Sequence, residues 1–201
     1  MSNYSRRNFK IFIKGELSGN QYKDTEDCIY LKHDEEYGIG VINNTDVKII
    51  AEYKVANIDV GELVIGPKKT VILDRPLYDT RKFKFVSLKS PEALECGISN
   101  TKNINISDVM VTIKPEKKTT YSQRNIASAL LIETDSASSR SIDLCDNSNE
   151  GGTILSNRKS SQTFHSVPSF KTQGEHIYTI LLLEKIEEKK IESLEDASRN
   201  W

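Results

Sequence analysis

The chain has 201 residues and a mass of 22.7 kDa, which suits one domain of generous size or one domain with a tail. Its 28 Lys and Arg residues almost balance its 29 Asp and Glu residues, so the net charge is -1. Such a balance gives no broad attraction for nucleic acid or for an anionic membrane, and we expect no direct nucleic-acid partner. No apolar stretch approaches the roughly 20 residues of a membrane helix, and we expect no membrane insertion.

The three cysteines, Cys28, Cys96 and Cys145, are an odd number at wide spacings. They match neither a disulfide framework nor a pair of metal ligands, so we expect buried free thiols. The first ten residues are polar, and no apolar run of signal-peptide length follows them. We therefore expect synthesis and assembly in the cytoplasm of a cell.

Residues 9–88 predict a succession of short strands. Apolar and polar side chains alternate over residues 9–14 and 47–55, which is the period of a strand with one buried face. Turn residues recur about every 8–12 positions, a spacing typical of an all-β sandwich. Shorter apolar runs that predict further strands lie at residues 28–31, 37–41, 63–65, 71–73 and 83–86.

One short helix is predicted after these strands. Ser90 is a good capping residue, Pro91 suits the first helical position, and Gly97 suits the position just past the end. Residues 109–113 alternate again and predict another strand. Residues 127–132 are too few to distinguish a strand from a short helix.

The C-terminal part of the chain changes character at Leu183. Residues 176–183 have apolar side chains at both odd and even positions, which predicts a central strand covered on both faces. The residues that follow are rich in Glu and Lys. They predict a charged tail, which is either a solvated helix, a frayed end or an arm that docks on a neighbouring subunit.

Few residues indicate chemistry. The three histidines, His33, His165 and His176, have none of the spacings of a metal or protease motif. The segment at residues 151–153, Gly-Gly-Thr, lacks the lysine of a phosphate-binding loop and predicts a tight turn. We therefore expect no catalytic residue, no cofactor and no metal ion.

The acidic segment at residues 143–157 is the best candidate for an ion site. Counted from Asp146, the residues Ser148, Glu150 and Gly151 match the third, fifth and sixth positions of a calcium loop. The twelfth position is Asn157 instead of the glutamate that binds calcium with both oxygens. A solvated loop is the better interpretation.

Several segments occur in a recognisable order. They read YGIGVINNTD at residues 37–46, DVGELVIGPKKTVILDRP at 59–76, KFKF at 82–85, GGTILSN at 151–157, QTFHSV at 162–167 and IYTILLL at 177–183. In this order they resemble small jelly-roll proteins in the virions of large icosahedral DNA viruses, and among them the penton, or vertex capsid, proteins of chlorella viruses. The resemblance covers residues 37–186 and is carried best by the Arg75–Pro76 pair and by Gly151 and Gly152.

The resemblance implies a single jelly-roll β-sandwich of about eight strands with one short helix. Residues 1–36 would form an N-terminal arm and the first strands, residues 37–183 the sandwich, and residues 184–201 the charged C-terminal tail. The implied function is that of a structural capsid protein, a penton or minor capsid protein of the virion. It would form a homopentamer at the vertices of the shell and contact the major capsid protein and other minor capsid proteins.

Two other functions stay open. The first is a ligand- or carbohydrate-binding β-sandwich module, although only 7% of the residues are the aromatics on which sugars stack. The second is an enzyme on a β scaffold, for which the acidic segment and a serine-rich stretch are the only hints. For the capsid function, the candidate assembly contacts are Arg75, Tyr78, Arg81, Ile186, Ile191, Leu194 and Trp201.

Overall fold

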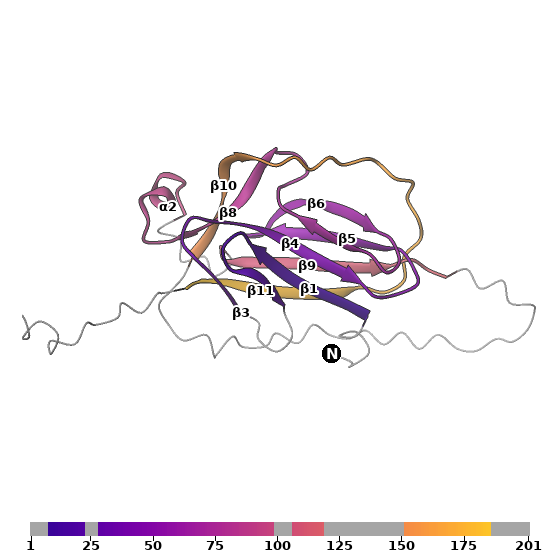
Figure 1. Cartoon of the computed structure of the whole chain (residues 1–201). Helices are drawn as coiled ribbons and strands as arrows, with labels where there is room; N and C mark the ends of the chain where they lie inside the picture. Colours follow the sequence, from indigo (N-terminus) through magenta and orange to yellow (C-terminus); the bar gives the residue numbers. More distant parts are fainter. Residues whose placement is uncertain (1–7, 23–27, 99–105, 119–150, 186–201) are drawn as a thin grey trace, which may run out of the picture.

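The computed structural model describes residues 8–22, 28–98, 106–118 and 151–185. In these ranges eleven strands form two sheets that pack face to face as a sandwich, with one short helix at one end (Figure 1). The all-β sandwich predicted from the sequence is confirmed, with more strands than expected. The strands are β1 Phe9–Gly15, β2 Gly19–Tyr22, β3 Cys28–Leu31, β4 Glu35–Asn43, β5 Ile49–Val55, β6 Ile58–Ile65, β7 Thr70–Leu73, β8 Arg81–Ser87, β9 Asp108–Pro115, β10 Gly151–Lys159 and β11 His176–Glu184.

The first sheet, sheet A, has the strand order β10-β8-β4-β1-β2. Strands β8 and β7 follow one another along the same edge of β4, because β8 pairs with its residues 35–37, β7 with residues 39–42, and β1 occupies the other edge. The second sheet, sheet B, has the order β3-β11-β9-β5-β6. Strand β11 is parallel to β3 and antiparallel to β9, so chain segments that are distant in sequence lie side by side.

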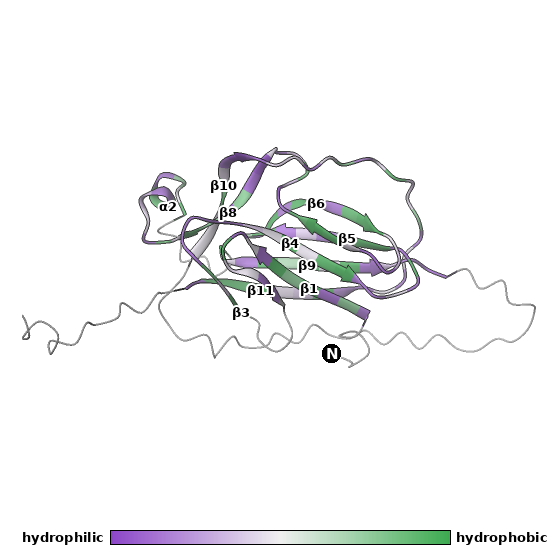
Figure 2. Ribbon diagram, viewed as in Figure 1, coloured by the Kyte–Doolittle hydropathy of each residue, from purple (hydrophilic) through white to green (hydrophobic). Residues whose placement is uncertain are grey.

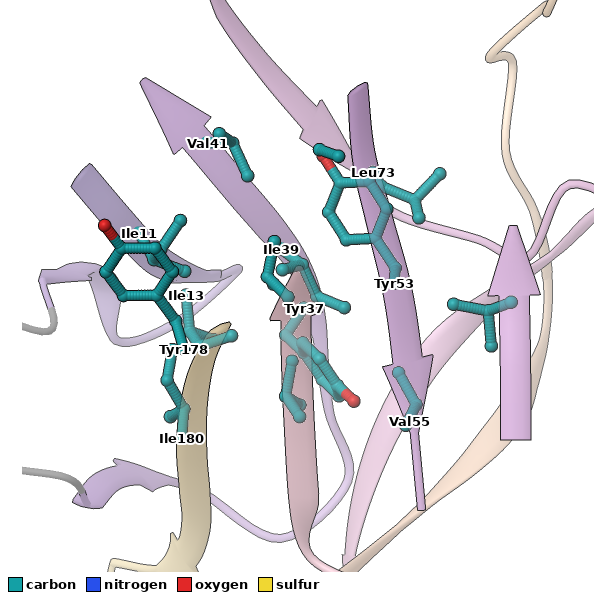
Figure 3. Packing of buried hydrophobic residues seen from close by; sticks show 14 of the residues in the cluster. Ile11, Ile13, Tyr37, Ile39, Val41, Tyr53, Val55, Leu73, Tyr178 and Ile180 are labelled. Carbon is teal, nitrogen blue, oxygen red and sulfur yellow. The ribbon is translucent and has the colours of Figure 1, made fainter. Parts of the chain in front are cut away.

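The core fills the space between the two sheets. Strand β5 alternates buried and less buried residues along its length, as the period-two pattern predicts. Figure 3 shows Ile11 and Ile39 of sheet A meeting Tyr53 and Tyr178 of sheet B in this layer. Burial of an aliphatic or aromatic side chain of this size stabilises the fold by roughly 1.5–3 kcal/mol. The largest fully buried side chains are Tyr53, Phe83, Phe85, Ile11, Ile13, Leu31, Ile39, Ile49, Ile65, Leu73, Ile113 and Ile180.

The helix α2, Pro91–Glu95, has the predicted capping residues. The Ser90 side chain accepts a hydrogen bond from the Ala93 amide, and Gly97 has a φ of 72° that favours glycine. Ala93 is buried and turns the helix towards β8. Within the described ranges, no helix has the length and hydrophobicity required to cross a membrane.

Strand β10 corrects the prediction of a tight turn at residues 151–153. These residues begin a strand and pair with Ser87, Val86 and Phe85 of β8. A side chain at Gly151 would collide with the Phe85 ring, so glycine is needed here for close packing and not for a turn. The acidic segment is therefore a strand from residue 151 onwards, and its remaining residues, 143–150, lie outside the described ranges.

Strand β11 is central, as predicted, because it lies between β3 and β9. The prediction that both of its faces are covered is wrong for part of the strand. Tyr178, Ile180 and Leu182 point into the core, whereas Ile177 on the other face is 41% exposed. Strand β2 was not predicted, since Gly-Asn-Gln-Tyr has no apolar alternation. The ambiguous segment at residues 127–132 lies outside the described ranges.

The cysteines differ from the predicted buried free thiols. Cys28 in β3 is disulfide-bonded, and Cys96, just after α2, is an exposed free thiol. Cys145 lies outside the described ranges. The spacing rules failed here because they consider neighbours in sequence, while a disulfide needs only closeness in space.

A long segment without strand structure, residues 160–175, connects β10 in sheet A to β11 in sheet B (Figure 1). We call it the strap. Its first residue, Ser160, donates its amide proton to the Thr80 carbonyl at 2.8 Å. Near its end, Gln173 donates to the Pro115 carbonyl at 2.8 Å. The strap is thus attached to the sandwich at both ends.

Candidate functional site

The connection between β7 and β8, residues 74–80, closes one side of the sandwich, and we call it the Arg75 loop. The Leu77 amide donates to the Val60 carbonyl of β6 at 2.9 Å, which joins the loop of sheet A to the edge strand of sheet B. Leu77 also occupies the space beside Gly61, where a Cβ atom would come within 2.5 Å of its Cδ1. Gly61 has a φ of 124°, so its conformation and its packing both favour glycine.

The Arg75 side chain holds this loop in shape from the inside. Arg75 is only 8% exposed. Its Nη1 donates hydrogen bonds to the main-chain carbonyls of Pro76 at 2.9 Å and Asp79 at 2.6 Å. Its Nη2 donates to the Gln162 carbonyl of the strap at 2.8 Å, and the guanidinium lies 4.4 Å from the centre of the Phe164 ring. Hydrogen bonds from a charged group and a cation–π contact therefore fix the loop and the strap to each other.

The outer side of the Arg75 loop presents an aromatic side chain. Tyr78 is 67% exposed, although Leu77 and Asp79 on either side of it are hydrogen-bonded to other residues through their main chains. The next residue, Asp79, accepts hydrogen bonds from Arg81 Nε at 3.1 Å and Nη2 at 2.7 Å. The same hydrogen bonds from Arg81 hold the pKa of Asp79 at about 2, so this pair stays charged through the physiological range.

The candidate assembly contacts fall into three groups. Arg75 is buried and shapes the loop, while Tyr78 and Arg81 reach the surface. Ile186, Ile191, Leu194 and Trp201 lie outside the described ranges.

Two adjacent carboxylates at the start of β4 are both buried, and they have different kinds of partner. Glu35 accepts hydrogen bonds from neutral groups, whereas Glu36 forms ion pairs. Glu35 is 1% exposed and accepts hydrogen bonds from the amides of Leu17 at 2.8 Å, Ser18 at 2.6 Å and Lys32 at 2.8 Å. It also accepts one from the Ser18 hydroxyl at 2.7 Å. The Glu35 carboxylate therefore organises the β1–β2 turn and the β3–β4 turn.

Glu36 points to the outer face of sheet A and belongs to a network of four charged side chains. Its Oε2 lies 3.3 Å from Lys82 Nζ and 3.4 Å from Arg158 Nη1. Glu16 completes the network, with one carboxylate oxygen 3.2 Å from Lys82 and the other 3.0 Å from Arg158. The Ser156 hydroxyl donates to the second oxygen of Glu36. We call these four charged residues, Glu16, Glu36, Lys82 and Arg158, the charge network.

Two members of the charge network, Glu16 and Lys82, have pKa values that are shifted towards their charged forms. Partial burial by itself raises the pKa of Glu16, but hydrogen bonds and charges from Lys82 and Arg158 outweigh burial and lower it. Burial by itself lowers the pKa of Lys82, and pairing with Glu16 and Glu36 raises it. Glu16 and Lys82 therefore favour each other's charged forms, and the four side chains carry two formal negative and two formal positive charges. Figure 2 shows the adjacent ends of β8 and β10 as strongly hydrophilic.

A cavity of about 260 Å³ lies beside this network. Its centre is β4 at Gly38, a residue without a side chain, and its walls come from β1, β7, β8 and the strap. The lining residues are Lys14, Glu16, Glu36, Tyr37, Gly38, Ile72, Asp74, Lys82 and Gln162. The Tyr37 phenol turns away into the core and bonds Thr153 at 2.7 Å, so the cavity has no aromatic platform from this residue.

The histidines lie apart from this cavity. His33 Nδ1 accepts a hydrogen bond from the Ser87 amide at 3.1 Å, and His176 packs against Phe9 with ring centres 5.4 Å apart. His165 is an exposed residue of the strap. Among the residues that the structure describes, no three His, Cys, Asp or Glu side chains form a group that could hold a metal ion.

Comparisons with known protein families, with characterised proteins and with solved structures give no match for this chain.

Most of the residues that build these features were not predicted from the sequence. A usable signal was present in β4, because Gly38 and Gly40 are two residues apart and must share one face of the strand. The Phe12 ring fills the space above Gly40, and the cavity lies beside Gly38. The burial of Arg75 had no comparable signal, since its hydrogen-bond partner in the strap, Gln162, is 87 residues further along the chain.

Proposed function

We propose that this protein is a structural capsid protein of the single jelly-roll type, a penton or minor capsid protein that self-associates into pentamers at the vertices of an icosahedral viral shell. The resemblance of residues 37–186 to such proteins motivates the proposal. The two-sheet sandwich is compatible with it, because a jelly roll also packs two sheets around one core.

The observation that carries the proposal is the construction of the Arg75 loop. The polar groups of Arg75 are turned inward to main-chain carbonyls, while Tyr78 is left 67% exposed on the outside. Tyrosine is enriched among the residues that dominate binding at protein interfaces. A loop that is already ordered loses little conformational entropy on binding, so its contacts yield more affinity. This arrangement suits a protein–protein contact better than catalysis.

A ring of five copies places a constraint on that contact. The interface must be heterologous, so the Arg75 loop of one copy meets a different surface of the next copy. Tyr78 would act as the anchor of the interface. The ion pair of Asp79 and Arg81 beside it would lie at the polar rim, where charges tune orientation more than affinity.

The experiment is the mass of the purified chain in solution, measured by light scattering over a range of concentrations. We expect the wild type to approach five times the 22.7 kDa chain mass, and Tyr78→Ala to shift the population towards monomer. Tyr30→Ala is the matched control, since Tyr30 is also exposed, at 42%, but lies on sheet B. A wild-type chain that stays a monomer at every concentration contradicts self-association. Equal effects of both substitutions contradict the role of the loop.

A further inference from the structure

We infer that the cavity on the outer face of sheet A binds a small zwitterion, a molecule of amino-acid size that carries one cationic and one anionic group. This inference goes beyond the capsid function and does not depend on it. It stands on the placement of Lys14 and Asp74 on either side of Gly38 and on the hydrogen bonds that occupy the other lining groups.

The chain at the cavity places opposite charges on the two sides of Gly38, a residue without a side chain. Lys14 of β1 pairs in register with Gly38 of β4. On the other edge of β4, Ile39 pairs with Leu73 of β7, so the following residue, Asp74, lies level with Gly38. Neighbouring strands are about 4.8 Å apart, which puts the backbones of Lys14 and Asp74 about 10 Å apart. The middle residue, Gly38, has no side chain, and the Ile72 side chain covers part of the space above it, with its Cγ2 2.6 Å from where a Cβ of Gly38 would lie.

Most other polar groups of the cavity are already bonded within the protein. The Gln162 amide donates to the Ile72 carbonyl at 2.6 Å and accepts from the Asp74 amide at 3.2 Å. Glu16, Glu36 and Lys82 are paired inside the charge network. A ligand could engage these groups only by displacing a partner that the fold already provides.

Lys14 and Asp74 are the groups that remain available. Lys14 is exposed, and its ammonium has no ion pair with any residue in the described part of the chain. Asp74 accepts a hydrogen bond from the Ser160 hydroxyl at 2.7 Å through Oδ1, which leaves Oδ2 for a ligand. Among the described residues, a cation without an ion pair and a carboxylate oxygen without a hydrogen bond match a ligand that has an anionic group and a cationic group.

The volume and the charges of the cavity limit the class of ligand further. A volume of about 260 Å³ is below the roughly 300–1,000 Å³ of pockets for drug-sized molecules, so the ligand is small. The charge network has two anions and two cations and adds no net charge. A ligand with a single charge would be attracted by one wall and opposed by the other, whereas a zwitterion is attracted by both.

The test is a titration of the full, ¹⁵N-labelled chain followed by its amide NMR signals. The probes are glycine and L-alanine as zwitterions, acetate and methylammonium as their single-charge halves, and glycerol as a neutral polyol. We expect glycine and L-alanine to shift the amide signals of Lys14, Gly38 and Asp74 saturably at millimolar concentration. We expect the other three probes to produce no saturable shift there.

Variants then assign the charges. Lys14→Gln and Asp74→Asn should each weaken zwitterion binding by about tenfold or more, the loss expected for one charged contact. Asp74→Asn keeps an Oδ1 acceptor for Ser160, so the strap stays attached. Lys10→Gln is the matched control, since Lys10 lies on the same strand and face but pairs opposite Ile42.

Each of three results would overturn the inference: no saturable shift with the zwitterions, binding of acetate or glycerol as tight as that of glycine, or a loss of binding in Lys10→Gln as large as in Lys14→Gln. Light scattering on the same samples separates this outcome from the capsid proposal, because loss of zwitterion binding and loss of self-association are measured independently.

Discussion

The protein buries charge in two ways, and the two regions that do so differ in what they can offer a partner. In the Arg75 loop, and around Glu35, the buried charge is stabilised mainly by hydrogen bonds with main-chain groups that the fold holds in place. In the charge network, Glu36 is paired with side chains from two other strands, Lys82 of β8 and Arg158 of β10, and Arg158 is 64% exposed.

This difference assigns different roles to the two regions. Main-chain partners cannot exchange without unfolding a turn, so Arg75 and Glu35 give loops a fixed shape. Side-chain partners can rotate, admit water or meet a ligand, so the charge network and the cavity beside it are adaptable. A fixed loop suits a protein contact, and an adaptable polar cavity suits a small molecule.

The largest expected effect is a difference in the free energy of unfolding between Glu35→Gln and Glu36→Gln. The two variants make the same change at adjacent buried carboxylates. Glu35→Gln replaces an oxygen that accepts main-chain bonds by an amide donor, and we expect a loss of about 2–4 kcal/mol in the free energy of unfolding. Glu36→Gln should cost only about 1–2 kcal/mol, because Lys82 and Arg158 keep Glu16 as a partner. Urea unfolding measures both values. An equal cost would show that the two kinds of partner are equivalent.

The salt dependence of the same two variants gives a second, smaller difference between the two regions. The destabilisation by Glu36→Gln should shrink as the ionic strength rises, because interactions of partly exposed charges are screened. The destabilisation by Glu35→Gln should stay nearly constant, since short buried hydrogen bonds to main-chain amides are screened much less. Repeating the urea series at low and high sodium chloride tests this. A salt-independent cost at Glu36 would place its network in a drier environment than the structure indicates.

The smallest expected effect is on the pH dependence of stability and comes from His176, which packs against Phe9 away from both regions. Burial lowers the pKa of His176 below its ordinary value of 6.5. As the pH falls below that value, the unfolded chain binds a proton before the folded chain does, so stability decreases until the folded pKa is also passed. His176→Gln should remove this part of the pH dependence, while His165→Gln in the exposed strap should retain it. Urea unfolding between neutral and mildly acidic pH measures the free energy of unfolding of each variant. An identical pH dependence in His176→Gln and His165→Gln would contradict the assignment to His176.

The sequence predicted the features that depend on neighbours along the chain. Alternation identified β5, and the Ser90, Pro91 and Gly97 pattern identified α2, because capping and strand periodicity are local properties. Gly151 was misread, since its role is to leave space for Phe85 in another strand.

The candidate site was less predictable for the same reason. Arginine is mostly exposed in proteins, so Arg75 was expected to be a surface contact, and its burial depends on Gln162 and Phe164 in the distant strap. Tyr78 lies in the loop between β7 and β8, whereas Arg81 begins strand β8. The cavity could not be predicted, because it exists only once β1, β4 and β7 lie side by side.

The most direct test of the central claim, that a buried arginine prepares the loop for a protein contact, is the dissociation constant of self-association for Arg75→Met. Sedimentation velocity would measure it at a temperature where circular dichroism shows the variant to be folded. We expect association at least about tenfold weaker than for the wild type, although Arg75 itself is too buried to touch a partner. Wild-type association by a folded Arg75→Met chain would contradict the claim.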